Sequence, residues 1–187
     1  EKVVHKNVKN TIKVVHKNVK YLRISFIFST FVAKILNNTK YTYMERLIIE
    51  ELLQWKSSPR RKPLILNGAR QVGKTWILKH FGQMHYDNVA YINCDKESLA
   101  AKLFEDYDVK RIIQAIETMT NTQIIAGKTL IIIDEIQEVP RGLHALKYFA
   151  ENAPEQHIAV AGSLLGLLLH QGESFPVGKV NMLQMHP

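Results

Sequence analysis

Residues 68–75 decide how this chain folds, and they read Gly68-Ala69-Arg70-Gln71-Val72-Gly73-Lys74-Thr75. The stretch matches the phosphate-loop pattern G-x-x-x-x-G-K-[ST] at every specified position. Gly68 and Gly73 allow the backbone to turn tightly and to point successive N–H groups at phosphate oxygens. In this pattern Lys74 reaches the β- and γ-phosphates of a nucleotide, and the Thr75 hydroxyl binds Mg²⁺. The sequence therefore predicts that residues 68–75 bind a nucleotide and Mg²⁺.

The residues on either side supply the context that the pattern requires. Residues 63–67 are a short apolar stretch typical of a buried strand, and residues 76–81 predict a helix that Gly82 ends. The phosphates would then lie at the N-terminus of this helix, where N–H groups without helical partners and the helix dipole both favour anions.

Strand and helix signals alternate along the rest of the chain. Strands are predicted at 88–93, 129–133 and 157–162, with a turn into a fifth strand over 175–182; helices are predicted near 47–55, 98–105, 109–119 and 141–152. Residues 129–133 form a continuous apolar run, as in a parallel strand that is buried on both faces. This alternation predicts an α/β fold with a parallel sheet between two layers of helices.

Polar residues follow two of the predicted strands at their carboxyl ends. We expect Asp134 to help hold Mg²⁺, and Glu135 to orient or deprotonate an attacking water. Ser163 would hydrogen-bond that water or the γ-phosphate. These roles require the loop and the acidic pair to meet at one edge of the sheet, and we expect them on neighbouring strands. Two alternatives stay open: the acidic pair caps a helix, and the serine is a turn hydroxyl.

The charge of the chain is unevenly distributed. Of its 187 residues, the first 43 contain nine Lys or Arg and one acid, which accounts for the whole net charge of +8. Residues 44–187 contain equal numbers of basic and acidic residues. Nucleic-acid binding is therefore expected, if at all, only through residues 1–43.

Residues 1–43 are expected to be an extension that is not part of the fold. The sequence of residues 2–9 recurs unchanged at residues 13–20, and so short a repeat cannot bury a core. The uncharged runs at 24–33 and 158–169 are too short to cross a membrane. Residues 44–187 would form the nucleotide-binding core, with Met44 as the natural start. The alternative is a basic arm that binds nucleic acid or anionic lipid.

The cysteine content points to a reducing compartment. Cys94 is the only cysteine, so an internal disulfide is excluded, and we expect a cytoplasmic protein. Its position at the end of a predicted strand indicates a small buried apolar side chain and not a reactive thiol.

Four stretches together resemble AAA-superfamily ATPases of the bacterial and archaeal ATP-binding protein type. They are GARQVGKT at 68–75, LIIIDEIQEVPR at 130–141, AVAGSLLG at 159–166 and SFPVGKV at 174–180. The resemblance covers about residues 44–187 and implies ATP and Mg²⁺ as ligands of a three-layer αβα core. It implies a Walker A motif at Gly68–Thr75, a Walker B motif with Asp134 and catalytic Glu135, and Ser163 as the sensor-one residue. Family members usually continue into a C-terminal domain of unknown function, which this sequence lacks.

One feature departs from the family pattern. AAA machines usually supply an arginine finger downstream of sensor one, often from a neighbouring subunit, and this sequence has no arginine after Arg141. Arg141 itself, sequence beyond this chain, a protein partner or self-association could supply it. We therefore expect Mg·ATP binding with slow hydrolysis, because an arginine finger is worth about 10³–10⁵ in rate. A nucleotide-gated binding module and a degenerate fragment with little turnover remain alternatives; a GTPase is disfavoured, because the guanine-reading N-K-x-D element is absent.

Overall fold

The computed structural model describes residues 47–96, 99–139, 141–163, 176 and 178–186. The extension predicted for residues 1–43 lies outside this part of the chain, so the division from residues 44–187 stays a prediction. Residues 140, 164–166, 174–175 and 177 of the family motifs also lie outside it. Over the part that the structure describes, no helix combines the length and the apolar character that crossing a membrane requires.

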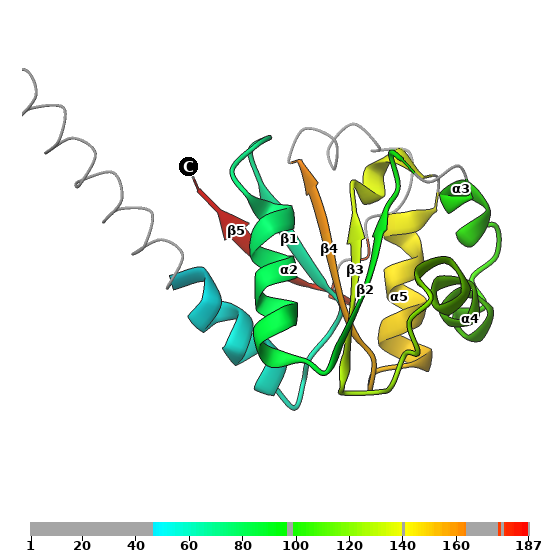
Figure 1. The fold of residues 1–187 in the computed structure, drawn as a ribbon, viewed down its shortest axis with the longest axis horizontal. Coiled ribbons are helices and arrows are strands. Elements are labelled where there is room, and N and C mark those ends of the chain that lie inside the picture. The colour runs from blue at the N-terminus through cyan, green and yellow to red at the C-terminus, as the bar shows by residue number, and fades with distance from the viewer. Residues whose placement is uncertain (1–46, 97–98, 140, 164–175, 177, 187) are drawn as a thin grey trace, which may run out of the picture. The chain divides into compact units, whose positions relative to one another are not determined.

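Five parallel strands form one sheet, as Figure 1 shows. They are β1 Leu64–Gly68, β2 Asn88–Asn93, β3 Thr129–Asp134, β4 His157–Ser163 and β5 Asn181–Met185, in the order β2-β3-β4-β1-β5. The predicted α/β fold with a parallel sheet is confirmed. The expectation of neighbouring strands is wrong, because β4 lies between β1 and β3. A physical reason is that six of the seven residues of β4 are buried, which suits a central strand covered on both faces.

Helices cover both faces of this sheet (Figure 1). Residues 47–57 are helical and pack with α2, Lys74–His85, on one face. The other face is covered by α3 Ala100–Leu103, α4 Val109–Thr120 and α5 Gly142–Asn152. The short 3₁₀ helix η1, Ile136–Glu138, follows β3. The result is a three-layer αβα arrangement.

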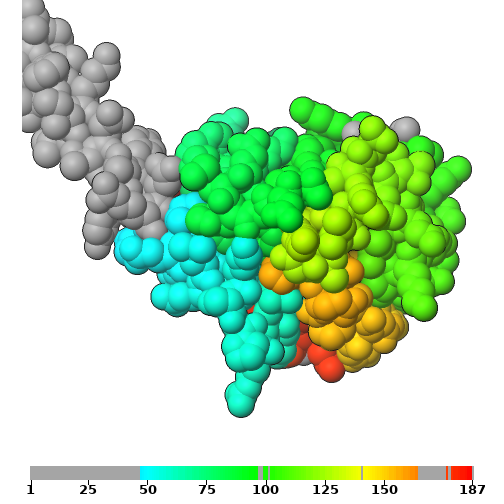
Figure 2. Space-filling view, turned by 60° about the horizontal axis from the view of Figure 1, so that its bottom comes forward, coloured from blue at the N-terminus to red at the C-terminus, as the bar shows by residue number. Residues whose placement is uncertain are grey.

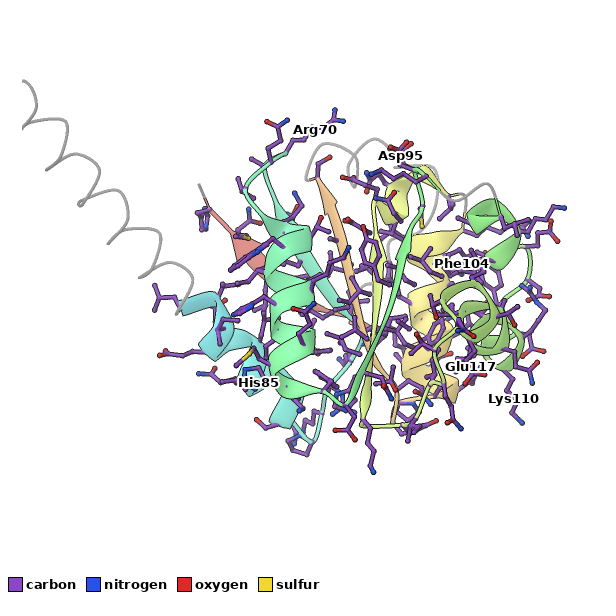
Figure 3. All side chains as sticks on the ribbon, in the orientation of Figure 1. Arg70, His85, Asp95, Phe104, Lys110 and Glu117 are labelled. Carbon is purple, nitrogen blue, oxygen red and sulfur yellow. The ribbon has the colours of Figure 1, made fainter. Side chains whose placement is uncertain are left out.

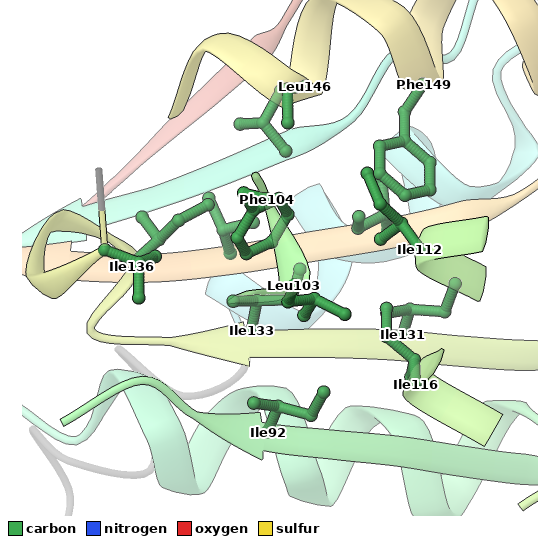
Figure 4. Close-up of a cluster of buried hydrophobic side chains, with 14 of the residues drawn as sticks. Ile92, Leu103, Phe104, Ile112, Ile116, Ile131, Ile133, Ile136, Leu146 and Phe149 are labelled. Carbon is green, nitrogen blue, oxygen red and sulfur yellow. The ribbon is translucent and has the colours of Figure 1, made fainter. Parts of the chain in front are cut away.

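The core follows from the alternation of side chains along the strands. In β3, Ile131 and Ile133 pack with α4 and α5, whereas Leu130 and Ile132 pack with α2 on the opposite face. Figure 4 shows the first of these clusters, where aromatic residues of α5 and of the α3 end meet the isoleucines of the sheet. Because every residue of β3 is buried, the carboxyl end of this strand is held rigidly.

Gly82 does not end the helix that follows the phosphate loop. The helix α2 continues to His85, and Gly82 is buried within it. A Cβ atom on Gly82 would lie 2.6 Å from Cγ2 of Val89 and 3.3 Å from Cδ2 of Leu130. The glycine therefore allows α2 to lie close to the sheet, which a pattern of local helix signals does not reveal.

Candidate nucleotide site

The phosphate loop begins where β1 passes closely beside β5. A Cβ atom on Gly68 would lie 2.5 Å from the carbonyl oxygen of Met185, so this position accepts only glycine without movement of the backbone. Further along the loop, Gln71 has φ of 66° and Gly73 has φ of 94°. Left-handed residues that alternate with residues of negative φ turn successive N–H groups toward one side, which forms an anion-binding concavity.

The start of α2 completes this concavity. Gly73 is the N-cap residue and carries no side chain that could bond the first helical N–H groups. The N–H of Ile77 bonds the carbonyl of Gly73 at 3.0 Å, so the N–H groups of residues 74–76 precede the first helical bond. Ala69, Arg70 and Gln71 are exposed beside this helix end. Figure 3 places Arg70 at the same end of the sheet as Asp95, and His85 at the other end.

Lys74 is held inside the loop. Its Nζ donates hydrogen bonds to the carbonyl oxygens of Gly68 at 2.9 Å and of Ala69 at 2.8 Å, and the residue is 7% exposed. Burial lowers the pKa of the Lys74 ammonium, and the charges of Glu135 and Asp134 oppose this shift. Both acceptors are neutral carbonyls, so an anionic phosphate oxygen would be a stronger partner for the ammonium.

Thr75 and Asp134 connect the loop to the acidic pair. The Thr75 hydroxyl, in the first turn of α2, donates to Oδ2 of Asp134 at 2.7 Å, although β4 separates β1, which leads into the loop, from β3. Asp134 is 4% exposed, and its Oδ1 accepts a hydrogen bond from the N–H of Glu135 at 3.2 Å. Because the Thr75 hydroxyl donates its hydrogen to the carboxylate, the lone pairs of its oxygen can still bind a cation. A hydroxyl and a carboxylate beside a phosphate cradle are ligands that fit Mg²⁺.

Glu135 lies at a sharp turn after β3. It has φ of 51°, it is half-buried, and its Oε2 accepts a hydrogen bond from the side chain of Gln137. Although Glu135 is the N-cap residue of η1, its side chain makes no capping bond there. The helix-capping alternative therefore does not describe Glu135.

Ser163 lies at the same edge of the sheet as the loop. It is the last residue of β4, it is partly exposed, and it is in register with Gly68 on β1. Arg141 is directed elsewhere, since its guanidinium donates to the carbonyl oxygen of Glu105 at 2.7 Å and lies 6.0 Å from the ring centre of Tyr107. These contacts place the Arg141 guanidinium beside the segment between α3 and α4.

Sequence reasoning missed two polar residues of β2 at this site. The Tyr91 hydroxyl donates to Oδ2 of Asp134 at 3.0 Å, and the Asn93 amide donates to the Tyr91 oxygen at 3.3 Å. Polar residues near the carboxyl end of the predicted strand 88–93 were a signal, but only the pairing of β2 with β3 places Asn93 beside Asp134.

Cys94 immediately follows β2, and its side chain is buried, as predicted. Burial raises the pKa of its thiol to about 12, and the nearby carboxylate of Asp134 adds to the shift. The thiol therefore stays protonated at neutral pH and behaves as a small apolar group.

This chain is similar to a family model and to solved structures. The family model described as AAA domain matches residues 60–187. A search of curated proteins finds no match. Among solved structures, the Aeropyrum pernix ORC1 protein in complex with DNA is 15% identical, with a TM-score of 0.43 over 75% of this chain and 44% of that chain. A variant of Thermotoga maritima RuvB is 16% identical, with a TM-score of 0.45 over 76% of this chain and 42% of that chain.

The family match includes the phosphate loop, both acidic residues and Ser163. The chain spans less than half the length of either solved structure. Since the match covers more than half of the chain, this protein belongs to the AAA domain family of P-loop ATPases.

Proposed function

We propose that this chain binds ATP with Mg²⁺ at residues 68–75 and hydrolyses it slowly. The observation that carries the proposal is the 2.7 Å hydrogen bond between Thr75 and Asp134. It brings a loop suited to phosphates and a carboxylate suited to Mg²⁺ to one point, although 59 positions separate them in the sequence. Backbone N–H groups of residues 69–75 would bind the phosphates, and Lys74 would neutralise charge on the β- and γ-phosphates.

Two further residues would act on the γ-phosphate side. Glu135 would orient or deprotonate the attacking water, because its carboxylate directly follows the Mg²⁺-side residue Asp134. Ser163 would donate a hydrogen bond to that water or to the γ-phosphate, since β4 ends beside the loop. Bound Mg²⁺ would supply neutralisation of the charge that develops on the phosphate oxygens.

Slow turnover follows from the position of Arg141. Its guanidinium bonds the carbonyl oxygen of Glu105 and lies against the ring of Tyr107, so we do not expect Arg141 to act as the arginine finger of its own loop. A protein partner or a second copy of the chain would supply this charge in trans, with an expected gain of about 10³–10⁵ in rate. If a second copy of the chain supplies the charge, the ATPase rate per molecule should rise with protein concentration. If a different protein supplies it, the rate per molecule of the isolated chain should not depend on concentration.

The proposal is tested by measuring ATP binding and steady-state hydrolysis of the wild type and of Glu135→Gln, with Glu138→Gln as the matched control. Glu138 is an exposed acid three residues further along the chain. We expect Glu135→Gln to keep its affinity for Mg·ATP and to lose hydrolysis, because the amide cannot accept the proton of water. Glu138→Gln should retain both properties.

Two results would change the assignment. If the wild type binds no ATP with Mg²⁺, the proposed function is wrong. If it binds ATP and Glu135→Gln does not alter the slow turnover, Glu135 is not the residue that activates the attacking water. The chain would then be better described as a module whose affinity for a partner depends on nucleotide.

A further inference from the structure

One oxygen of Asp134 accepts two hydroxyl groups. Its Oδ2 lies 2.7 Å from the Thr75 hydroxyl and 3.0 Å from the Tyr91 hydroxyl, which reach it from α2 and from β2. Its Oδ1 accepts one bond, from the N–H of Glu135. A carboxylate offers about four lone-pair sites. Described residues occupy three of these sites, and among them none occupies the remaining site on Oδ1.

The direction of the Tyr91 hydrogen bond is fixed by its neighbours. The N–H groups of Asp95 and Lys96 donate to Oδ1 of Asn93 at 3.0 and 3.2 Å, so the amide nitrogen of Asn93 faces Tyr91. That nitrogen is a donor and occupies a lone pair of the Tyr91 oxygen. The phenolic hydrogen is therefore directed to Asp134.

A positive charge also lies over the ring of Tyr91. The Lys79 ammonium lies 3.3 Å from the centre of the Tyr91 ring. A cation over the ring attracts its electrons and so strengthens the hydroxyl as a donor.

We propose that Tyr91 is a positioning residue for Asp134: by occupying Oδ2 together with Thr75, it leaves one acceptor site on Oδ1 for the cation or for a water bound to it. The inference rests on the proposed function, since it concerns the same Mg²⁺ site. Mg²⁺ loses its bound waters reluctantly, whereas Ca²⁺ accepts carboxylates directly and in variable geometry. A carboxylate with one remaining site therefore favours Mg²⁺ over Ca²⁺.

The test is calorimetric titration with a non-hydrolysable ATP analogue in EDTA, in Mg²⁺ and in Ca²⁺. Tyr91→Phe removes only the hydroxyl, and Asn93→Ala removes the group that orients it. Tyr148→Phe is the matched control, because it deletes the same atom from α5, where the Tyr148 ring stacks on Tyr107. The affinity of Tyr91→Phe should be unchanged in EDTA and should fall roughly tenfold in Mg²⁺, the usual size of the effect when a partner of a metal ligand is lost.

The loss in Ca²⁺ should be smaller, so that the preference for Mg²⁺ over Ca²⁺ decreases, and Asn93→Ala should shift it in the same direction. Equal losses in EDTA and in Mg²⁺ would indicate a purely structural role and overturn the inference. So would a Tyr91→Phe protein that behaves like Tyr148→Phe while the wild type binds the analogue normally. Absence of binding by the wild type in every condition would instead remove the proposed function itself, and this inference with it.

Discussion

The carboxyl ends of the strands differ from their amino ends in how polar side chains are bonded. A group of polar and aromatic residues at the amino ends is called the amino-end cluster here; it consists of Trp55, Lys56, Arg61, Tyr86 and His157. Figure 2 brings this end of the molecule forward, and the segments that lead into β3 and β4 lie side by side there. At the carboxyl ends, the phosphate loop and the acidic pair meet instead.

Within the amino-end cluster, polar atoms bond to one another and to backbone carbonyls. The Tyr86 hydroxyl and Nδ1 of His157 are 2.6 Å apart, and the Trp55 indole N–H donates to the carbonyl of Lys62 at 2.8 Å. Arg61 donates to the carbonyl oxygens of Lys56 and Pro154. The bonds of Trp55 and of Arg61 to Lys56 join the helix over residues 47–57 to the segment before β1. The Tyr86–His157 contact is buried, so a ligand could not replace it without opening the core.

At the carboxyl ends, a bound ligand could replace some of the hydrogen-bond partners. Lys74 bonds neutral carbonyls that a phosphate can replace, and Gln71, Gly73 and Glu135 hold left-handed conformations. Residues in sparsely populated backbone conformations cluster at functional sites, because the surrounding structure maintains them for a purpose other than stability. The comparison teaches that substitutions at this end should change ligand binding, whereas substitutions in the amino-end cluster should change folding.

The largest expected effect is the loss of nucleotide binding in Lys74→Ala. Removing a charged donor from a phosphate costs about 2–3 kcal/mol, which is roughly a hundredfold in affinity. The free energy of unfolding should change less, because Ala69 is exposed and water can replace the ammonium there, so that only the buried bond to Gly68 is lost. Titration with Mg·ATP and urea unfolding measure the two effects, with the exposed Lys102→Ala as control. A Lys74→Ala protein that loses stability and keeps its affinity would contradict the comparison.

Gly68→Ala should lower both the free energy of unfolding and the affinity for nucleotide. Its Cβ would lie 2.5 Å from the carbonyl oxygen of Met185, so β1 and β5 must separate locally, at a cost of about 1–3 kcal/mol in the free energy of unfolding. Nucleotide affinity should fall as well, because the loop moves. Gly127→Ala is the control: Gly127 also has positive φ, 73°, but nothing lies within 4 Å of its added Cβ. Equal nucleotide affinity in the two variants would show that the approach to Met185 does not shape the loop.

The sequence predicted the parts of this site that depend on local pattern. The bounds of β2 at 88–93 are those expected, and Asp134 and Glu135 stand at the end of a buried strand. An apolar run between turn residues and a glycine-rich loop act through nearby residues, so both can be recognised without knowledge of the fold.

The parts that depend on strand order could not be predicted. Nothing in the sequence indicates that β4 lies between β1 and β3, or that β2 pairs with β3 and brings Tyr91 to Asp134. The role of Gly82 could not be predicted either, because it depends on the close approach of Gly82 to Val89 on the strand that follows.

The free energy of unfolding should depend on pH through His157 of the amino-end cluster. Burial lowers the pKa of His157 to about 4, and the charges of Arg61 and Lys56 act in the same direction. As pH falls below about 6.5, the unfolded chain takes up a proton that the folded protein excludes, so stability is lost between about pH 6.5 and pH 4. We expect about 1–2 kcal/mol less stability from His157 at pH 5 than at pH 7.5. Urea unfolding of His157→Gln at both pH values should show a smaller difference than the wild type; an equal difference would exclude His157 as the source.

The smallest expected effect is that of Tyr86→Phe, which makes at the amino ends the same chemical change that Tyr91→Phe makes at the carboxyl ends. The loss of the 2.6 Å contact with His157 should lower the free energy of unfolding by about 1 kcal/mol, because Nδ1 of a buried imidazole loses its partner. Nucleotide affinity in Mg²⁺ should be unchanged, since Tyr86 precedes β2 at the end of the sheet opposite the phosphate loop. Measuring urea unfolding and nucleotide titration on both variants compares one deleted hydroxyl at two places in the same sheet. If Tyr86→Phe weakened nucleotide binding as Tyr91→Phe is expected to, the two ends of the sheet would be coupled, and the separation of folding from binding would fail.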